Sequence, residues 1–253
     1  MGRFVDGAVV DAWLLRLRDA LADLPGFAGM WLHGSAATGD WVAGVSDVDV
    51  LIGWTVPLAS AERIVLRDVF DRSLRACPGG NADIHVVTLS VAAEPPHVPP
   101  YELYAGRHPV DDDEPAFTGR AEDIGLLFDL ASARASGITI AGPQAQEVFG
   151  EVPVAWLVEA ADHELAEWEG YDQFRQPHMA VLQAARAWLL AVEGRLASKV
   201  AAGRWAAECW SRPDPIMAAL ARQRGNKDVV VDEVEARSLI AHARCEIGSR
   251  TQP

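Results

Sequence analysis

The sequence is poor in cysteine and has no long apolar run. Its 253 residues include three cysteines, Cys77, Cys209 and Cys245, which are widely separated and match no zinc-binding or disulfide spacing. They are typical of core or surface thiols in a reducing compartment. No apolar stretch approaches the roughly 20 residues of a membrane span, and the N-terminus lacks a basic segment followed by an apolar one. We therefore expect a cytoplasmic protein without a membrane partner.

Positive charge is also scarce. Lysine and arginine total 22 against 36 aspartates and glutamates, so the formal net charge is −14. Proteins that bind nucleic acids usually carry a basic stripe that neutralises phosphates. No such stripe is visible, and we expect no nucleic-acid partner. An acidic enzyme attracts a cationic substrate, although surplus acid also serves solubility.

Apolar residues, by contrast, are plentiful. They make up 50% of the chain, which is ample for a packed core and excludes global disorder. Strand patterns occur up to about residue 150, and helical patterns alone follow. We therefore predict an α+β protein with two domains, a mixed sheet with helices at 1–150 and an all-α bundle at 151–253. We expect a monomer.

One stretch combines several motifs in a fixed order. An apolar segment at 30–32 precedes Gly34 and Ser35, and Asp47 and Asp49 begin twelve residues after Ser35. In an extended chain side chains alternate, so the two carboxylates point the same way. Like charges this close require a cation between them, and hard oxygen ligands suit magnesium. Gly-Ser turns and Asp-x-Asp strand ends are common separately, so the combination carries the interpretation.

This order and spacing resemble the nucleotidyltransferase superfamily of polymerase β type. Its motif is Gly-Ser followed, about a dozen residues later, by Asp-x-Asp and an apolar strand. Backbone N–H groups of Gly34 and Ser35, with the Ser35 hydroxyl, could hold the triphosphate of a nucleotide whose metal the aspartates carry. Ser46, which opens the Ser-Asp-x-Asp motif, is assigned with them to the nucleotide. The implied chemistry is nucleotidyl transfer.

The strand expected at 82–89 places Asp83 and His85 on one face. In the superfamily that it resembles, a carboxylate on the strand after the crossover helix completes the acidic cluster, which is the position of Asp83. The alternative is a solvent-exposed cap of the strand. His85 fits a packed strand residue, and we leave it outside the site.

Periodicity and breakers predict the other elements of the first domain. Residues 94–120 hold six prolines and an acidic run at 111–114, and we expect a surface loop. The acidic run is either solvated or lines the approach of a cationic substrate. The expected helices lie at 8–24, 59–77 and 121–136, and the other expected strands at 27–33, 47–54 and 137–143.

Helical patterns fill the rest of the chain, and the tail at 248–253 is expected to fray. Asp-Ile-Gly-Leu-Leu from Asp123, Ile-Ala-Gly-Pro before residue 144, Arg-Ala-Trp from Arg186 and Gly-Arg-Leu-Ala-Ser-Lys up to Lys199 resemble the adenylyltransferases that act on streptomycin and spectinomycin. The resemblance covers residues 31–208. In that family the N-terminal domain holds ATP and magnesium, and the helical domain closes the cleft over the antibiotic. The expected helices lie at 154–169, 177–193, 197–211, 214–223 and 231–248.

The resemblance implies roles for the first-domain residues. Ser35 would contact the nucleotide phosphates, and Asp47 and Asp49 would hold magnesium, with two ions about 4 Å apart in the arrangement known for such transfers. Asp83 would take the place of a family glutamate that acts as general base, and it is one methylene shorter.

In the helical domain, Arg186 and Lys199 match basic residues that meet the ATP phosphates. Two cations in an acidic chain suit this role, and the alternative is two solvated helix positions. The acceptor end matches poorly: His108 stands where members that accept streptomycin have a tryptophan. Asp172 and Glu169 lie near the start of the Arg186 helix and are candidates to bind amino groups of an acceptor.

The sequence thus predicts magnesium-dependent transfer of AMP from ATP to a hydroxyl of a cationic small molecule, an aminoglycoside or aminocyclitol antibiotic above all. Two other functions stay open. One is a regulator that keeps the fold and binds nucleotide without turnover. The other is a nucleotidyltransferase toxin or regulator that modifies a protein or RNA.

Overall fold

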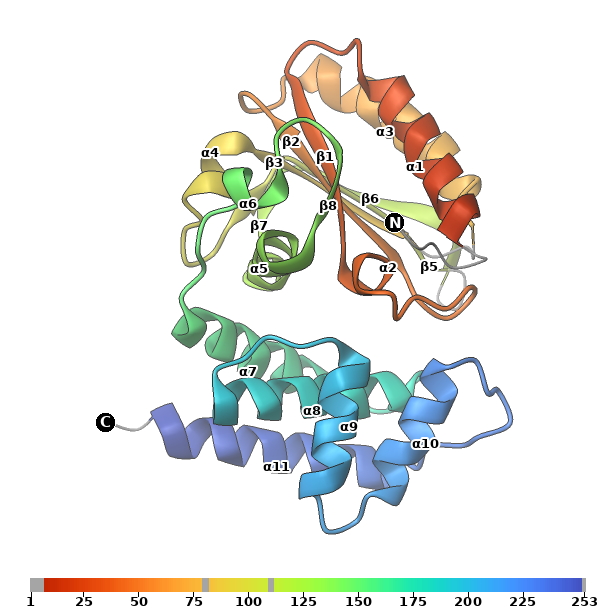
Figure 1. The fold of residues 1–253 in the computed structure, drawn as a ribbon, viewed down its shortest axis with the longest axis vertical. Helices are drawn as coiled ribbons and strands as arrows, with labels where there is room; N and C mark the ends of the chain where they lie inside the picture. The colour runs from red at the N-terminus through yellow and green to blue at the C-terminus, as the bar shows by residue number, and fades with distance from the viewer. Residues whose placement is uncertain (1–6, 79–81, 109–111, 252–253) are drawn as a thin grey trace. The chain divides into compact units, whose positions relative to one another are not determined.

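A computed structural model describes residues 7–78, 82–108 and 112–251. The chain divides into two compact units, Met1–Val152 and Pro153–Pro253. Among the described residues, all strands lie in the first unit, whereas the second is built from helices (Figure 1). None of the described helices has both the length and the apolar character that a membrane span needs.

The described residues of the first unit form a six-stranded mixed sheet. In spatial order its strands are β6 (Asp112–Thr118), β5 (Leu103–His108), β3 (Ala82–Thr88), β2 (Val48–Trp54), β1 (Phe27–His33) and β8 (Ile138–Ala141). Helix α3 (Ser60–Arg75) joins β2 to β3, and this crossover makes the two strands parallel. The other neighbouring pairs are antiparallel. The predicted α+β fold is confirmed.

One face of this sheet carries the apolar core. Helices α1 (Gly7–Leu21) and α3 lie next to each other along it (Figure 1). Val50 and Ile84 are fully buried in this core. Because successive strand residues point to opposite faces, Asp49 and Asp83, their neighbours in sequence, point away from it. Burial of the apolar residues therefore decides where the two carboxylates point.

The opposite face is covered by α5 (Leu126–Ser136) together with two short helices, α4 (Leu89–Ala93) and α6 (Ala145–Val148). Trp31 on β1 is fully buried there. Its ring meets Phe149 edge-on, with ring centroids 5.1 Å apart, and its Nε1 donates to the Pro143 carbonyl at 3.0 Å. These contacts hold the segment after α5 against the sheet. A third short helix, α2 (Gly34–Thr38), follows β1, and its residues Ala36 and Ala37 pack against the apolar core of the first face.

The proline-rich stretch at 94–120 is not the predicted loop. It forms β5 and β6, and also the short strand β4 (Pro100–Tyr101), which pairs with β7 (Ala121–Glu122). Leu103 and Ala105 alternate into the core, which favours a strand. Pro115 is compatible with β6 because this strand is the edge of the sheet. Residues 112–114 of the acidic run lie in β6, and Asp111 lies outside the described residues.

Three further expectations change. Gly34–Thr38 is a short helix between the strands expected at 27–33 and 47–54, where no helix was expected. The helix predicted at 121–136 begins at Leu126, after a turn in which the Gly125 N–H donates to Asp123 Oδ1 at 2.7 Å. The tail predicted to fray is helical up to Thr251, because Ile247 is buried and anchors the last turns.

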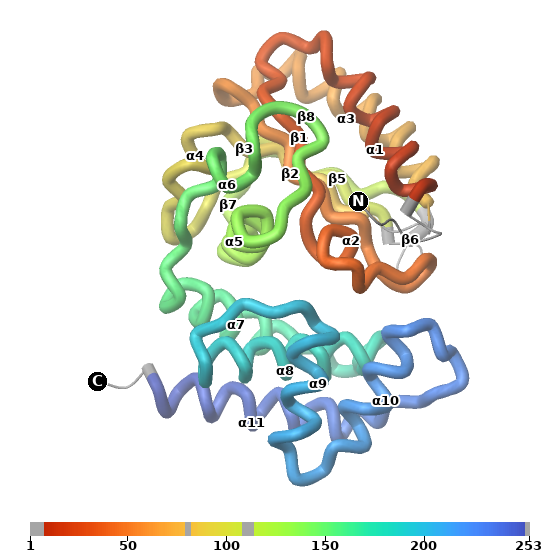
Figure 2. Tube along the Cα trace, viewed as in Figure 1, coloured from red at the N-terminus to blue at the C-terminus, as the bar shows by residue number. Residues whose placement is uncertain are grey.

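The second unit is a helical bundle centred on one helix, which Figure 2 traces along the chain. This helix, α8, is buried along most of its length and contacts each of the other four. It begins with Pro177 at its first position. Gly194 directly follows its last residue and caps it, with a φ of 64° that is readily adopted only by glycine. The helices are α7 (Val154–Gly170), α8 (Pro177–Glu193), α9 (Lys199–Cys209), α10 (Asp214–Gln223) and α11 (Glu233–Thr251).

Two isoleucines of the first unit provide a matched test of this core. Ile84 is fully buried on β3, whereas Ile64 on α3 is 65% exposed. We expect Ile84→Ala to lower the free energy of unfolding by about 2–5 kcal/mol, because it leaves a cavity. Ile64→Ala should change it by about 0.5 kcal/mol or less. Chemical denaturation of both variants measures the difference, and equal losses would contradict the assigned register of β3.

Candidate active site

Three carboxylates meet at one end of the central strands. Asp47 directly precedes β2, Asp49 lies in β2, and Asp83 is the register partner of Asp49 on β3. Each side chain is half-buried, and one oxygen from each lies within 4.8 Å of the others. Because Asp47 and Asp49 are two residues apart in extended chain, both follow the face that Asp83 occupies. The sequence predicted this convergence.

This oxygen cluster fits a hard divalent cation. Three negative groups at such distances repel one another unless positive charge lies between them. Carboxylate oxygens are the ligands that magnesium takes, and magnesium leaves coordination positions for water and phosphate. Asp47, Asp49 and Asp83 are therefore the residues that could hold a metal here. Asp83, which the sequence assigned as general base, lies within the same set.

Gly34 makes room for Asp49. A Cβ built on Gly34 would lie 2.0 Å from Asp49 Oδ2, and the φ of Gly34 is 64°. Both observations require glycine at this position. The next residue, Ser35, donates its hydroxyl to the Asp47 carbonyl at 3.5 Å. Ser46 is buried and its Oγ accepts the Val42 N–H at 3.2 Å, which closes the loop before β2. The Gly-Ser motif therefore packs directly against the carboxylate cluster.

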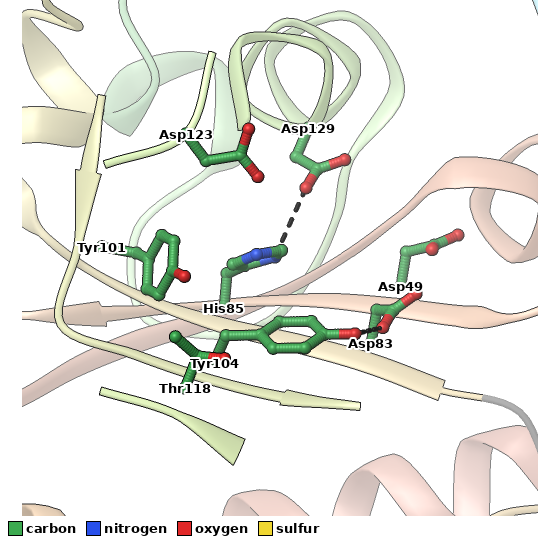
Figure 3. Close-up of a pocket in the computed structure, with 8 residues that line it drawn as sticks. All are labelled: Asp49, Asp83, His85, Tyr101, Tyr104, Thr118, Asp123 and Asp129. Atoms are coloured by element: carbon green, nitrogen blue, oxygen red, sulfur yellow. Dashed lines mark hydrogen bonds and ion pairs between the residues drawn. The ribbon is translucent and has the colours of Figure 1, made fainter. Parts of the chain in front are cut away.

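Tyr104 is a site residue that sequence reasoning missed. It lies on β5, and its hydroxyl donates to Asp83 Oδ1 at 2.5 Å (Figure 3). Burial, and then the charge of Asp83, raise the pKa of the Tyr104 phenol well above its ordinary value, so it stays protonated. The alternation of Leu103 and Ala105 was the available signal. The prolines on either side of these residues favoured a loop over a strand.

His85, which the sequence left outside the site, lies in it. Its Nδ1 is 3.4 Å from Asp129 Oδ2 of α5, and His33 Nδ1 is 4.0 Å from the other oxygen of that carboxylate. Burial lowers the pKa of His33 to about 3 and also lowers the pKa of His85. Both imidazoles are thus neutral at pH 7, and both face the carboxyl group of Asp129.

These groups surround a pocket of about 360 Å³. Asp123 lies at its rim, exposed, with Oδ1 on the Gly125 N–H. Tyr101, nearly buried, forms another wall, and its ring meets His85 edge-on at 5.4 Å between centroids. The pocket is strongly acidic and partly aromatic, which suits a cationic ligand with apolar faces. Figure 3 shows the lining residues Asp49, Asp83, His85, Tyr101, Tyr104, Thr118, Asp123 and Asp129.

The sequence named three candidates for contacts with the acceptor, Glu169, Asp172 and His108. Glu169, at the end of α7, accepts from Arg244, whose guanidinium also donates to Asp162 at 2.8 Å. Asp172 follows this helix and is exposed. His108 ends β5, and its side chain lies outside the described residues. Glu169 and Asp172 thus belong to the second unit, whereas the pocket is lined by residues of the first.

The predicted phosphate-binding cations belong to the helical unit. Arg186 lies on α8 and Lys199 begins α9, and both are half-buried. His178 is buried at the start of α8, and the positive charges of Arg222 and Lys199 influence its pKa. Burial first, and then these two cations, lower the pKa of His178 to about 4. Lys199 is thus part of a local group of positive charges.

The comparisons with known proteins agree on one group. A family model described as "Aminoglycoside adenylyltransferase, C-terminal domain" matches residues 147–245. An aminoglycoside (3'') (9) adenylyltransferase of Klebsiella pneumoniae is 30% identical over 192 residues, 73% of this chain and 72% of the relative. Its counterpart from Rhizobium radiobacter is 28% identical over 220 residues, 81% and 80% of the two chains.

A solved structure shares the fold. The crystal structure of spectinomycin adenyltransferase AAD(9) from Enterococcus faecialis, with ATP and spectinomycin, aligns with a TM-score of 0.75 at 17% identity, over 92% of this chain and 95% of that one. The relatives and the family model show the class of enzyme, a nucleotidyltransferase. Its family follows from the relatives: the chain belongs to the aminoglycoside adenylyltransferases.

Two glycines test the clearance around Asp49. Gly34 and Gly44 have φ values of 64° and 69°, but a Cβ on Gly44 would meet nothing within 4 Å. Alanine at either position therefore carries a similar backbone strain of about 1–2 kcal/mol. Only Gly34→Ala displaces the Asp49 carboxylate, and we expect it alone to weaken Mn²⁺ binding, by about tenfold or more. Electron paramagnetic resonance titration measures this affinity, and similar affinities in both variants would exclude the clearance role.

His178 predicts a pH dependence in the helical unit. Its folded-state pKa of about 4 lies below the ordinary value of 6.5. As pH falls below 6.5, the unfolded chain binds a proton that the folded unit excludes, so stability is lost until about pH 4. Between pH 7 and pH 5 we expect His178 to account for about 2 kcal/mol of lost stability. Denaturation of wild type and His178→Gln at both pH values measures this share, and parallel losses would contradict it.

Proposed function

We propose that this protein transfers AMP from ATP to a hydroxyl of an aminoglycoside or aminocyclitol antibiotic, a cationic small molecule of the streptomycin and spectinomycin type. The observation that carries the proposal is the cluster of Asp47, Asp49 and Asp83 within 4.8 Å, in a member of the aminoglycoside adenylyltransferase family. A relative's name gives AMP transfer to aminoglycosides as its activity, and this supports the same reaction here.

Asp47 and Asp49 would hold magnesium, as one ion or as a pair. Bound there, the metal offsets the charge on the phosphates during transfer. The backbone N–H groups and hydroxyl of the Gly34-Ser35 segment lie next to these carboxylates and are suited to the nucleotide phosphates. Ser46 supports this segment from the loop before β2.

In the reaction, the acceptor hydroxyl oxygen attacks the α-phosphorus of ATP, and the bond from that phosphorus to pyrophosphate breaks. The hydroxyl proton passes to the carboxylate of Asp83, the proposed general base. Arg186 and Lys199 would meet the phosphates from the helical domain and stabilise the charge on the leaving pyrophosphate. This assignment requires that the domain at 151–253 close over the nucleotide.

The acidic pocket supports a cationic acceptor. Asp123 and Asp129 also line the pocket and add two carboxylates to those of Asp49 and Asp83 (Figure 3). The side chain of Asp123 is exposed. Ammonium groups of an acceptor would pair with these carboxylates. Asp172, Glu169 and His108 stay predictions for further acceptor contacts. The monomeric state and the cytoplasmic location expected from the sequence also stay predictions.

The test is pyrophosphate release from ATP and magnesium across a panel of streptomycin, spectinomycin and other cationic antibiotics. We expect release with at least one compound and an increase in its mass by one AMP. Asp47→Asn and Asp49→Asn should lower kcat by about a thousandfold or more, because each removes a charged metal ligand. Asp68→Asn, on the exposed side of α3, makes the same chemical change outside the site and should leave kcat unchanged.

Two outcomes would overturn the proposal. Retained turnover in either Asp47→Asn or Asp49→Asn would exclude the metal assignment. If the protein binds ATP but releases pyrophosphate with none of the compounds in the panel, these antibiotics are excluded as acceptors. In that case AMP from radiolabelled ATP appearing on a protein in lysate would identify a different acceptor.

A further inference from the structure

The hydrogen bond between Tyr104 and Asp83 is built into two neighbouring strands. On β3 and β5 the register pairs are His85 with Tyr104 and Asp83 with Gly106. The Tyr104 ring therefore lies diagonally across the pair, over Gly106, to bring its hydroxyl 2.5 Å from Asp83 Oδ1. An O–H donor to a carboxylate at this distance is a strong, charge-assisted hydrogen bond.

Gly106 provides the space for this bond. A Cβ at residue 106 would lie 2.1 Å from the Tyr104 hydroxyl and 2.7 Å from Asp83 Oδ1. Gly106 is not among the glycines with positive φ. The absence of a side chain, and not an unusual backbone conformation, is thus what the bond requires here.

The ring of Tyr104 is held from its other side as well. Its centroid is 4.8 Å from that of His85, at an interplanar angle of 38°, and His85 in turn contacts Asp129 of α5. The phenol therefore has little freedom to rotate away from Asp83. A tyrosine phenol is protonated at neutral pH, and the geometry makes it the donor toward the carboxylate.

We propose that Tyr104 is a positioning residue, which fixes the rotation of the Asp83 carboxylate through the hydrogen bond to Oδ1 and so sets the direction of its second oxygen. The inference rests on the proposed function for the role of Asp83 in proton transfer. It also has a consequence that is independent of turnover. Asp83 belongs to the oxygen cluster, so a carboxylate that can rotate should bind a divalent cation less tightly.

The first variant is Tyr104→Phe, which keeps the ring and its packing on His85 and removes only the hydroxyl. We expect kcat to fall about ten- to a hundredfold, with KM for ATP and for the acceptor changed less than about threefold, because the bond orients a reacting group and does not bind substrate. Mn²⁺ affinity should fall about tenfold. Tyr171→Phe makes the same chemical change at an exposed tyrosine of the helical unit and should change none of these values.

The second variant is Gly106→Ala, which keeps both groups, but its Cβ displaces the phenol and the Asp83 carboxylate and so breaks the bond between them. If both variants act through the same hydrogen bond, the loss in kcat of the double variant should be smaller than the product of the two single losses. A role of Tyr104 in packing alone would lower the melting temperature and leave Mn²⁺ affinity and kcat per folded molecule near wild type.

The proposal is overturned if Tyr104→Phe keeps kcat and Mn²⁺ affinity within twofold of wild type, or if the losses of the two variants multiply. Failure of the proposed function is a separate result, since wild type itself would then release no pyrophosphate with any acceptor. The Mn²⁺ titration of wild type, Tyr104→Phe and the double variant would still decide the positioning role in that case.

Discussion

The site depends on mutual repulsion among three carboxylates that the fold does not allow to separate. Parallel pairing of β2 and β3 fixes Asp49 beside Asp83, and the extended chain before β2 brings Asp47 to the same face. The residues that alternate with them, Val50 and Ile84 among others, are fully buried against α1 and α3. Rotating either strand to relieve the repulsion would expose that core. Apolar burial thus keeps the three carboxylates close together, and a cation between them would offset their repulsion.

Much of the fold and part of the carboxylate cluster could be predicted, because they follow from local sequence patterns. Asp47 and Asp49 share one strand and one face, so their convergence needs only the period of an extended chain. Asp83 was assigned through the resemblance to the superfamily, in which a carboxylate on the strand after the crossover helix completes the acidic cluster. The parallel pairing of β2 with β3 places it beside Asp49. The helical unit was equally accessible, since proline and glycine limit its helices.

The rest of the site arises from pairings between distant segments. Tyr104 and Asp83 are 21 residues apart in sequence, and their contact depends on the register of β5, which runs through a stretch whose prolines suggested a loop. The partner of His85 is Asp129 on α5, and no sequence spacing relates a strand residue to a distant helix that packs on the same face of the sheet. Side-chain patterns predict which face a residue occupies, but they do not predict which neighbour it meets there.

The two glycines that contact the carboxylates give this site walls made of main chain. At Gly34 and at Gly106 a single methyl group would occupy the space that Asp49, Asp83 and Tyr104 now fill. Natural or laboratory evolution toward a new acceptor therefore has little freedom on this inner side. The outer rim, where Thr118 and Asp123 are exposed to solvent, has more space for other side chains. A library of variants at the rim that leaves the two glycines unchanged would test which acceptors the pocket can bind. It would leave the arrangement of Asp49 and Asp83 intact.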